Sequence, residues 1–146
     1  MDQKPSFPVF PMYFRGLLLL AGMYTVAWSA FFKWFGPTLL AWLAMDLPAN
    51  EGLTSNYYGT FGLIIGVVIF VSAFYPVSWI KLILAGIVGK LILTLWFSIG
   101  YLPELGWNKR TAFHILFNEI LWMVPLALIF FRAKAVKEYL EKSENT

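Results

Sequence analysis

Four apolar segments, each long enough to cross a lipid bilayer as a helix, restrict this chain to one class of fold. They cover residues 12–35, 57–75, 77–100 and 111–131. About 20 apolar residues in a helix span the hydrocarbon core. Because unpaired backbone groups are too costly in lipid, such segments cross it as helices. The sequence therefore predicts an all-α polytopic membrane protein, with four transmembrane helices in one bundle.

The composition agrees with this class. Hydrophobic residues make up 60% of the 146 residues and charged residues 13%, whereas soluble domains average roughly 45–50% and 25%. The chain has no cysteine, which excludes disulfides, thiolate metal sites and a peroxidase that attacks through cysteine. The net charge of +3 is small. We therefore expect membrane lipids as partners and no nucleic acid.

The segments are joined as two hairpins with unequal connections. Pro76 alone separates the second segment from the third, whereas the first connection is long and carries its own apolar run, 37–47. A short amphipathic helix with one apolar stripe lies in the membrane interface. We expect such a helix here. Its stripe has Trp42 beside it and consists of Leu39, Leu40, Leu43 and Leu47.

Aromatic residues near the predicted helix ends support these boundaries. Tryptophan and tyrosine are enriched where helices leave the hydrocarbon. The residues in this position are Trp34, Tyr57, Tyr58, Tyr75, Trp79, Tyr101 and Trp107. They predict an aromatic belt at both membrane faces.

The basic residues predict the orientation of a single domain, 1–146. An even number of spans places both termini on one side, and cytoplasmic segments carry an excess of lysine and arginine. The terminal side holds Lys4, Arg15, Lys81 and the basic tail 132–146, with Arg132, Lys134, Lys137 and Lys142. The opposite side holds Lys33, Lys109 and Arg110. We expect a multi-pass protein of a bacterial inner membrane with both termini in the cytoplasm.

Two ionisable residues, Lys90 and Glu119, lie deep inside the apolar segments. Lys90 lies ten residues before Gly100 and Glu119 nine after Arg110, which places each about 13–15 Å below the external face. Antiparallel neighbouring helices then bring the two charges within reach of each other. Such charges pair with one another or mark a functional site. Two interpretations stay open, a structural ion pair and a carboxylate that accepts a proton or orients a ligand.

The fourth segment carries a polar stripe beside Glu119. Its members follow helical spacing and are Thr111, His114, Asn118, Trp122 and Pro125. The candidate ligand-binding residues are therefore Lys90, Glu119, Asn118, Trp122 and His114. His114 is the single histidine, and haem or metal ligation needs more ligands than the sequence places near it. We expect no cofactor, no metal site and no catalytic residues, with His114 as a hydrogen-bonded packing residue near the external interface.

Glycines in the second and third segments predict close helix packing. Small residues at helical spacing let membrane helices approach each other closely. Four such positions are Gly62, Gly66, Gly86 and Gly89. They favour packing inside the bundle, and the alternatives are homodimerisation and docking onto a larger complex.

Two motifs suggest a family. GxxGK ends at Lys90, and NExxWxxP begins at Asn118. Over about two thirds of its length the chain resembles an uncharacterised family of small bacterial four-helix membrane proteins. The family is similar in layout to DoxX-like proteins and is often labelled alkyl hydroperoxide reductase. The other shared residues are Trp28, Ser29, Gly62, Gly66, Tyr75, Pro76, Trp79, Leu102 and Pro103. The chain departs from the family pattern at Glu119, where an aspartate is typical, and at Met123, where a second tryptophan is typical. The resemblance implies a fold and no activity.

These features predict a small accessory or scaffold protein of the membrane, within a complex or an oligomer. They favour a role without catalysis and leave enzymatic activity other than a cysteine peroxidase open. One alternative is a binder or carrier of a lipidic small molecule, such as a lipid or quinone, that meets the Lys90–Glu119 pair. Another is a proton-coupled transporter. Small transporters of that kind carry an essential acid in the first helix, and residues 12–35 contain none.

Overall fold

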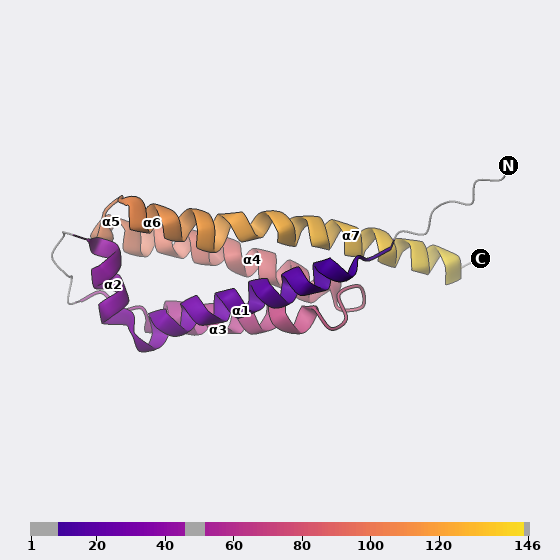
Figure 1. The fold of residues 1–146 in the computed structure, drawn as a ribbon, viewed down its shortest axis with the longest axis horizontal. Coiled ribbons are helices and arrows are strands. Elements are labelled where there is room, and N and C mark those ends of the chain that lie inside the picture. Colours follow the sequence, from indigo (N-terminus) through magenta and orange to yellow (C-terminus); the bar gives the residue numbers. More distant parts are fainter. Residues whose placement is uncertain (1–8, 46–51, 145–146) are drawn as a thin grey trace.

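The structure is a computed structural model that describes residues 9–45 and 52–144, and this part of the chain is helical without a strand (Figure 1). Leu47 of the predicted interfacial stripe and Lys4 of the terminal side lie outside the described residues. The α-helices are α1 (Met12–Trp34), α2 (Gly36–Ala44), α3 (Asn56–Ser72), α4 (Ile80–Trp96), α5 (Leu102–Leu105), α6 (Lys109–Phe113) and α7 (Leu121–Glu144). Two π-helical segments, η1 (Phe97–Tyr101) and η2 (His114–Ile120), continue α4 and α6.

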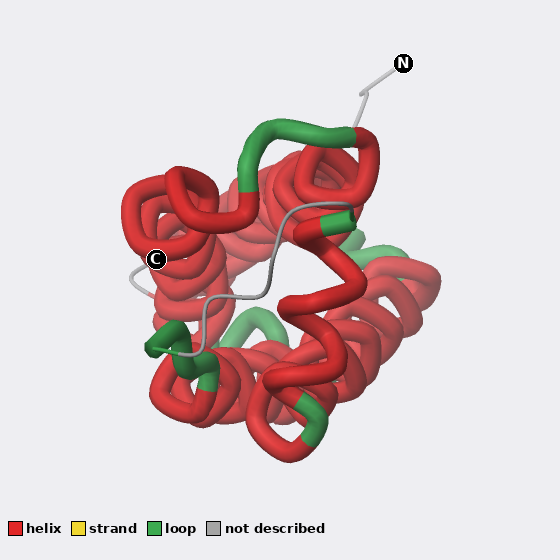
Figure 2. The backbone as a smooth tube through the Cα atoms, turned by 90° about the vertical axis from the view of Figure 1, so that its left-hand side faces the viewer, coloured by secondary structure: helices red, strands yellow, loops and turns green. Residues whose placement is uncertain are grey.

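The long helices run side by side. α1 packs on α3, α3 on α4 and α4 on α7, while α1 also touches α7. Figure 2 shows these helices arranged around one axis, with α2 lying across one end. We call this the α2 end. The start of α1 and the end of α7 lie at the opposite end, which we call the terminal end.

Three continuous helical stretches are long and apolar enough to cross a membrane: Met12–Trp34, Ile80–Leu105 and Lys109–Glu144. The apolar helix α3 is shorter, with 17 residues. The chain is therefore a helical membrane protein. The last stretch has 36 residues, which exceeds the roughly 20 that a bilayer needs, so α7 continues through the predicted tail as a helix.

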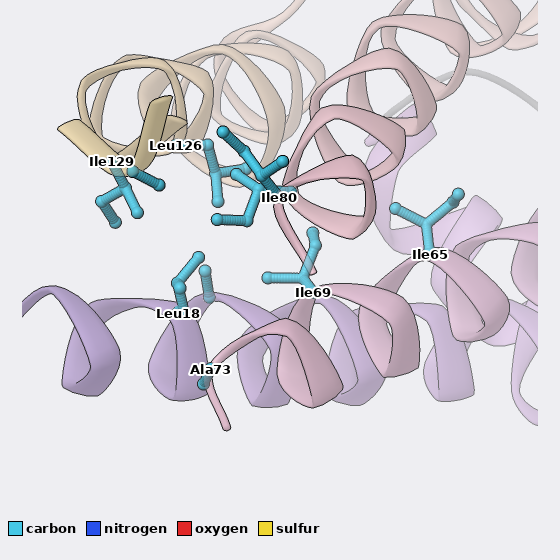
Figure 3. Packing of buried hydrophobic residues seen from close by; sticks show 10 residues of the cluster. Leu18, Ile65, Ile69, Ala73, Ile80, Leu126 and Ile129 are labelled. Atoms are coloured by element: carbon cyan, nitrogen blue, oxygen red, sulfur yellow. The ribbon is translucent and has the colours of Figure 1, made fainter. Parts of the chain in front are cut away.

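Two apolar clusters fill the interior. The terminal cluster contains only aliphatic residues and alanines at its centre: Leu18, Ala21, Ile65, Ile69, Ala73, Ile80, Ile83, Leu126, Ile129 and Ala133. Figure 3 shows its side chains pointing toward one another from the long helices. The α2-end cluster is rich in aromatic rings and contains Phe32, Leu40, Leu43, Ala44, Tyr58, Leu93, Phe97, Tyr101, Leu105 and Ile115. The helices thus enclose a dry aliphatic half and an aromatic half.

The glycines mark the closest helix contacts. A Cβ atom added at Gly66 would lie 2.8 Å from the Val26 backbone nitrogen, which leaves no room for a side chain. Gly62 faces Ser29 in the same α1–α3 contact. Across the α3–α4 contact, Gly86 faces Ile69 and Gly89 faces Ile65. All four glycines predicted to pack helices therefore lie at contacts inside the molecule.

The turn at Pro76 is longer than the sequence predicts. α3 ends at Ser72 and α4 begins at Ile80, whereas we expected helix up to Pro76 and again directly after it. Proline has no backbone N–H and disfavours helical geometry in the residue before it. α3 therefore ends before Pro76, and α4 begins only several residues after it.

α2 is fastened to the α2 end by hydrogen bonds to its last carbonyl groups. Asn108 Nδ2 donates to the Leu43 carbonyl oxygen (2.8 Å), and Arg110 Nη1 donates to that of Trp42 (2.7 Å). The Arg110 guanidinium also lies over the Trp42 ring, 4.6 Å from its centroid. α2 ends at Ala44, so the observed helix is shorter than the predicted 37–47. Its apolar residues Leu40, Leu43 and Ala44 are buried in the α2-end cluster.

The aromatic belt prediction is wrong for two residues. Tyr58 and Tyr101 are only 2% and 4% exposed, and both belong to the α2-end cluster. The exposed members are Trp34, Tyr57, Tyr75, Trp79 and Trp107. A tyrosine near a helix end satisfies its hydroxyl equally well in the interior when a partner is present.

Candidate functional site

Lys90 and Glu119 meet between the two apolar clusters. Lys90 Nζ lies 3.5 Å from Glu119 Oε2, as the depths computed from the sequence predict. The residues are 1% and 5% exposed. α4 supplies Lys90, and the π-helical segment η2 supplies Glu119. A charged pair thus lies in the interior at the level where the aliphatic and aromatic halves join.

The π-helix η2 explains how several polar residues face inward together. Its backbone bonds run from residue i to i+5, so each turn holds more residues than an α-helical turn. His114, Ile115, Asn118 and Glu119 are all buried within it. In a regular α-helix Glu119 would lie beside the stripe of His114 and Asn118, as the sequence predicts. π-helical turns are often found at functional sites.

Asn118 is the centre of the hydrogen-bond network. Its side-chain oxygen accepts a hydrogen bond from the Tyr24 hydroxyl of α1, and its Nδ2 lies 2.9 Å from His114 Nδ1. Its backbone carbonyl oxygen accepts a hydrogen bond of 2.8 Å from Lys90 Nζ. Asn118 therefore links α1 and α4 through η2.

The direction of these bonds assigns the hydrogen on His114. Because the Asn118 oxygen already accepts from Tyr24, its amide nitrogen donates to His114 Nδ1. A nitrogen that accepts carries no hydrogen, and in a neutral imidazole the other nitrogen then carries it. His114 Nε2 therefore donates to the Tyr58 hydroxyl oxygen, 2.8 Å away. This bond brings α3 into the network.

The Glu119 carboxylate has unused acceptor capacity. An ionised carboxylate offers about four lone-pair sites. Among the buried side-chain atoms of the described residues, Glu119 Oε2 has no hydrogen-bond partner. Its distance of 3.5 Å to Lys90 exceeds the roughly 2.7–2.9 Å of a charge-assisted hydrogen bond. Glu119 Oε1 lies 3.9 Å from His114 Nε2. The carboxylate is held by charge attraction and not by hydrogen bonds.

Four of the five candidate residues from the sequence belong to this network: Lys90, His114, Asn118 and Glu119. Trp122 does not reach the charged pair through any polar contact among the described residues. It is partly buried against the terminal cluster, and its ring centroid lies 5.3 Å from that of Tyr24.

Two residues of the network, Tyr24 and Tyr58, are not among the sequence candidates. Tyr58 was placed in the aromatic belt. Tyr24 lies in a continuous apolar segment with no motif around it, although it is an amphipathic residue in the middle of a predicted span. A buried tyrosine hydroxyl needs a hydrogen-bond partner, which is the signal that could have identified Tyr24.

Comparisons with known proteins found no relative of this chain. No protein-family model matches it, and no curated protein or solved structure matches it either. Within the described residues, no three histidine, aspartate or glutamate side chains gather as metal ligands. The geometry of the polar network and the exposed residues of the helices therefore provide the basis for a functional proposal.

Proposed function

We propose that the chain is a small scaffold protein of the membrane, a four-span bundle that works within an oligomer or a membrane complex. The observation that carries this proposal is that one buried polar network joins all the long helices. Tyr24, Tyr58 and Lys90 reach it from α1, α3 and α4, and His114, Asn118 and Glu119 reach it from η2. Nearly all its polar atoms are used inside the molecule, which supports a role in fixing helix register.

The short helix α3 is the proposed fourth span. Its 17 residues correspond to about 25 Å of helix and lie at the lower limit of the roughly 17–25 residues of membrane helices. Tyr58, Gly59, Gly62 and Gly66 bury one face of it inside the bundle. Ile64 and Val67 are exposed on it, and in a membrane they would contact lipid or a partner. This layout is also the one implied by the resemblance to DoxX-like proteins.

Purification under mild conditions tests the scaffold function. The protein is extracted from its native membrane in mild detergent, and the intact assembly is weighed by native mass spectrometry. We expect a stoichiometric protein partner or a homo-oligomer, whose helices would pack against exposed side chains such as Leu20, Val88 and Leu128. A monomer that carries a lipidic molecule in stoichiometric amount would contradict this proposal.

That second outcome would favour a binder of lipidic small molecules. A cavity of about 340 Å³ at the α2 end supports this alternative. Its apolar lining includes Phe32, Leu40 and Leu105, and Lys33 and Asn56 stand among its polar residues. A molecule with an apolar body and a polar or anionic head would suit such a lining. The site differs from the Lys90–Glu119 pair that the sequence suggested.

We further propose a bacterial inner membrane with the terminal end in the cytoplasm. Lys81, Lys134 and Lys137 line a shallow groove between α4 and α7 at this end, together with Glu138 and Glu141. Clustered lysines at a helix end favour the cytoplasmic side and contact with anionic phospholipid head groups.

Labelling of single cysteines tests this orientation. The chain has no natural cysteine, so each introduced thiol reports one position. In intact cells we expect an impermeant thiol reagent to label Glu104→Cys at the α2 end and to leave Ser143→Cys at the terminal end unlabelled. Both variants should react after the membrane is opened. Labelling of Ser143→Cys alone in intact cells would invert the proposed topology.

A further inference from the structure

The polar network has polar neighbours toward one end of the molecule and apolar neighbours toward the other. Toward the terminal end it meets the terminal cluster, whose buried residues are all apolar (Figure 3). The nearby buried hydroxyls are bound to their own helices, since Thr25 donates to the Ala21 carbonyl and Ser72 to the Ile69 carbonyl. No described polar side chain in the terminal cluster leads from Glu119 toward that end. Moving a charge along this direction would cost the full desolvation penalty.

Polar groups continue in the opposite direction, toward the α2 end. His114 Nε2 lies between the Glu119 carboxylate and the Tyr58 hydroxyl, at 3.9 and 2.8 Å. The Tyr58 ring packs edge-on against the Tyr101 ring, with centroids 5.3 Å apart. The Tyr101 hydroxyl donates to the Thr54 carbonyl oxygen at 2.7 Å. Thr54 also lines the cavity at the α2 end. Hydroxyl-bearing residues therefore lie between Glu119 and that cavity, and the packed rings of Tyr58 and Tyr101 join the two hydrogen-bonded parts.

We propose that Glu119 is a proton-binding site that exchanges its proton only with the aqueous phase at the α2 end. Oε2 is ion-paired with Lys90 but accepts no hydrogen bond, and Oε1 makes only a long contact with His114, so the carboxylate has lone pairs that can accept a proton. The ligand is the proton itself because the side chains around Glu119 are already engaged with one another. This proposal goes beyond the scaffold function, which requires no exchange with solvent.

The transfer balances as a relay of three protons. The His114 ring first turns its Nε2–H from the Tyr58 hydroxyl oxygen toward Glu119 Oε1, which closes their 3.9 Å separation to hydrogen-bond distance. The N–H bond then breaks as the proton passes to the carboxylate. The O–H bond of Tyr58 breaks as its proton passes to Nε2, and a hydronium ion arriving from the α2 end restores the Tyr58 hydroxyl. One hydronium becomes water, the carboxylate becomes a carboxylic acid, and His114 and Tyr58 finish as they began. The charge of the site rises by one.

The ionisable groups around Glu119 come from each element packed against it. Lys90 of α4 faces it directly, and His114 lies on η2 itself. Tyr58 of α3 stands behind His114, Tyr101 of η1 stands behind Tyr58, and Tyr24 of α1 reaches the neighbouring Asn118. Once Glu119 is protonated, Lys90 keeps its hydrogen bond to the Asn118 carbonyl oxygen.

Infrared difference spectroscopy on vesicles with one protein orientation tests the proposal. Protonation of a carboxylate creates the C=O stretching band of a carboxylic acid. The pH is lowered only to about 6, where ordinary exposed carboxyl groups stay ionised. We expect the band to appear when the solution at the α2 end is acidified in this way and to stay absent when only the solution at the terminal end is acidified. Glu119→Gln should remove the band, and Glu104→Gln, which changes an exposed carboxyl group at the α2 end, should keep it.

Tyr58→Phe tests the route. It removes the relay hydroxyl and leaves the carboxylate in place. The band should therefore reach the same amplitude, and the rate at which it appears should fall about tenfold or more. If Glu119→Gln does not fold, the double variant Lys90→Met with Glu119→Gln, which leaves no lone buried charge, replaces it and should also lack the band. A band that survives in folded Glu119→Gln, or that answers equally to both sides, would overturn the proposal. Unchanged kinetics in Tyr58→Phe would overturn the route through the aromatic cluster.

Discussion

Lys90→Met should destabilise the protein by about 3–5 kcal/mol, because it leaves the Glu119 carboxylate buried without its ion-pair partner. Glu119→Gln should have a similar cost, since it leaves the Lys90 ammonium unpaired. The double variant Lys90→Met with Glu119→Gln removes both charges and should recover most of the loss. Unfolding in a denaturing detergent, followed by the fluorescence of the tryptophans, measures each free energy of unfolding.

The control is Lys81→Met on the same helix. Lys81 is exposed near the start of α4, so its replacement should change the stability by no more than about 0.5 kcal/mol. If Lys90→Met proves as stable as Lys81→Met, the 3.5 Å contact does not hold the helices together. A double variant no more stable than either single variant would show that the pair does more than neutralise charge.

Gly66→Leu should prevent the correct packing of α1 on α3. Its first side-chain atom would meet the backbone of Val26 at 2.8 Å and that of Gly22 at 3.1 Å, and backbone cannot move aside as a flexible side chain does. Overpacking of this kind costs about 1–3 kcal/mol and sometimes more. We expect a lower unfolding temperature and a broadened elution profile in detergent.

Gly16→Leu provides the matched control in α1. No atom lies within 4 Å of a Cβ added at Gly16, so the same change of residue meets no steric obstacle there. The variant should elute and unfold like the parent protein. Equal behaviour of Gly66→Leu and Gly16→Leu would contradict the close α1–α3 contact.

The contact between Lys90 and Glu119 could be predicted from the sequence because it follows from the distance of each residue from the end of its helix. Each residue of a membrane helix advances by a fixed rise, and charges are scarce in apolar segments. Two charges at equal depth on antiparallel neighbours then have few other partners. The glycine contacts follow from the same logic, since small residues at helical spacing reveal where helices approach each other.

The rest of the site depends on contacts that no local pattern encodes. The π-helical turn of η2 holds Asn118, which is hydrogen-bonded to Tyr24 and Lys90 on other helices. From the sequence alone, an ordinary α-helix is therefore predicted for the segment around His114 and Glu119. Tyr58 lies near a predicted helix end, where residues of an aromatic belt are expected. In the structure its side chain is buried and its hydroxyl group contacts His114. The π-helical turn of η2 and the burial of Tyr58 both involve contacts with residues far away in the sequence.

The order in which the chain is synthesised sets a problem for the insertion of α4. Lys90 precedes its partner Glu119 by more than a helix length, so at roughly 5–20 residues per second the ammonium group is made seconds before the carboxylate. During that interval a lone charge at the centre of a helix opposes entry into lipid by about 2.5–3.5 kcal/mol. We therefore expect the third hydrophobic segment to enter lipid less readily alone than together with the fourth. Biogenesis of this protein is expected to proceed by the joint release of the last two helices into the bilayer.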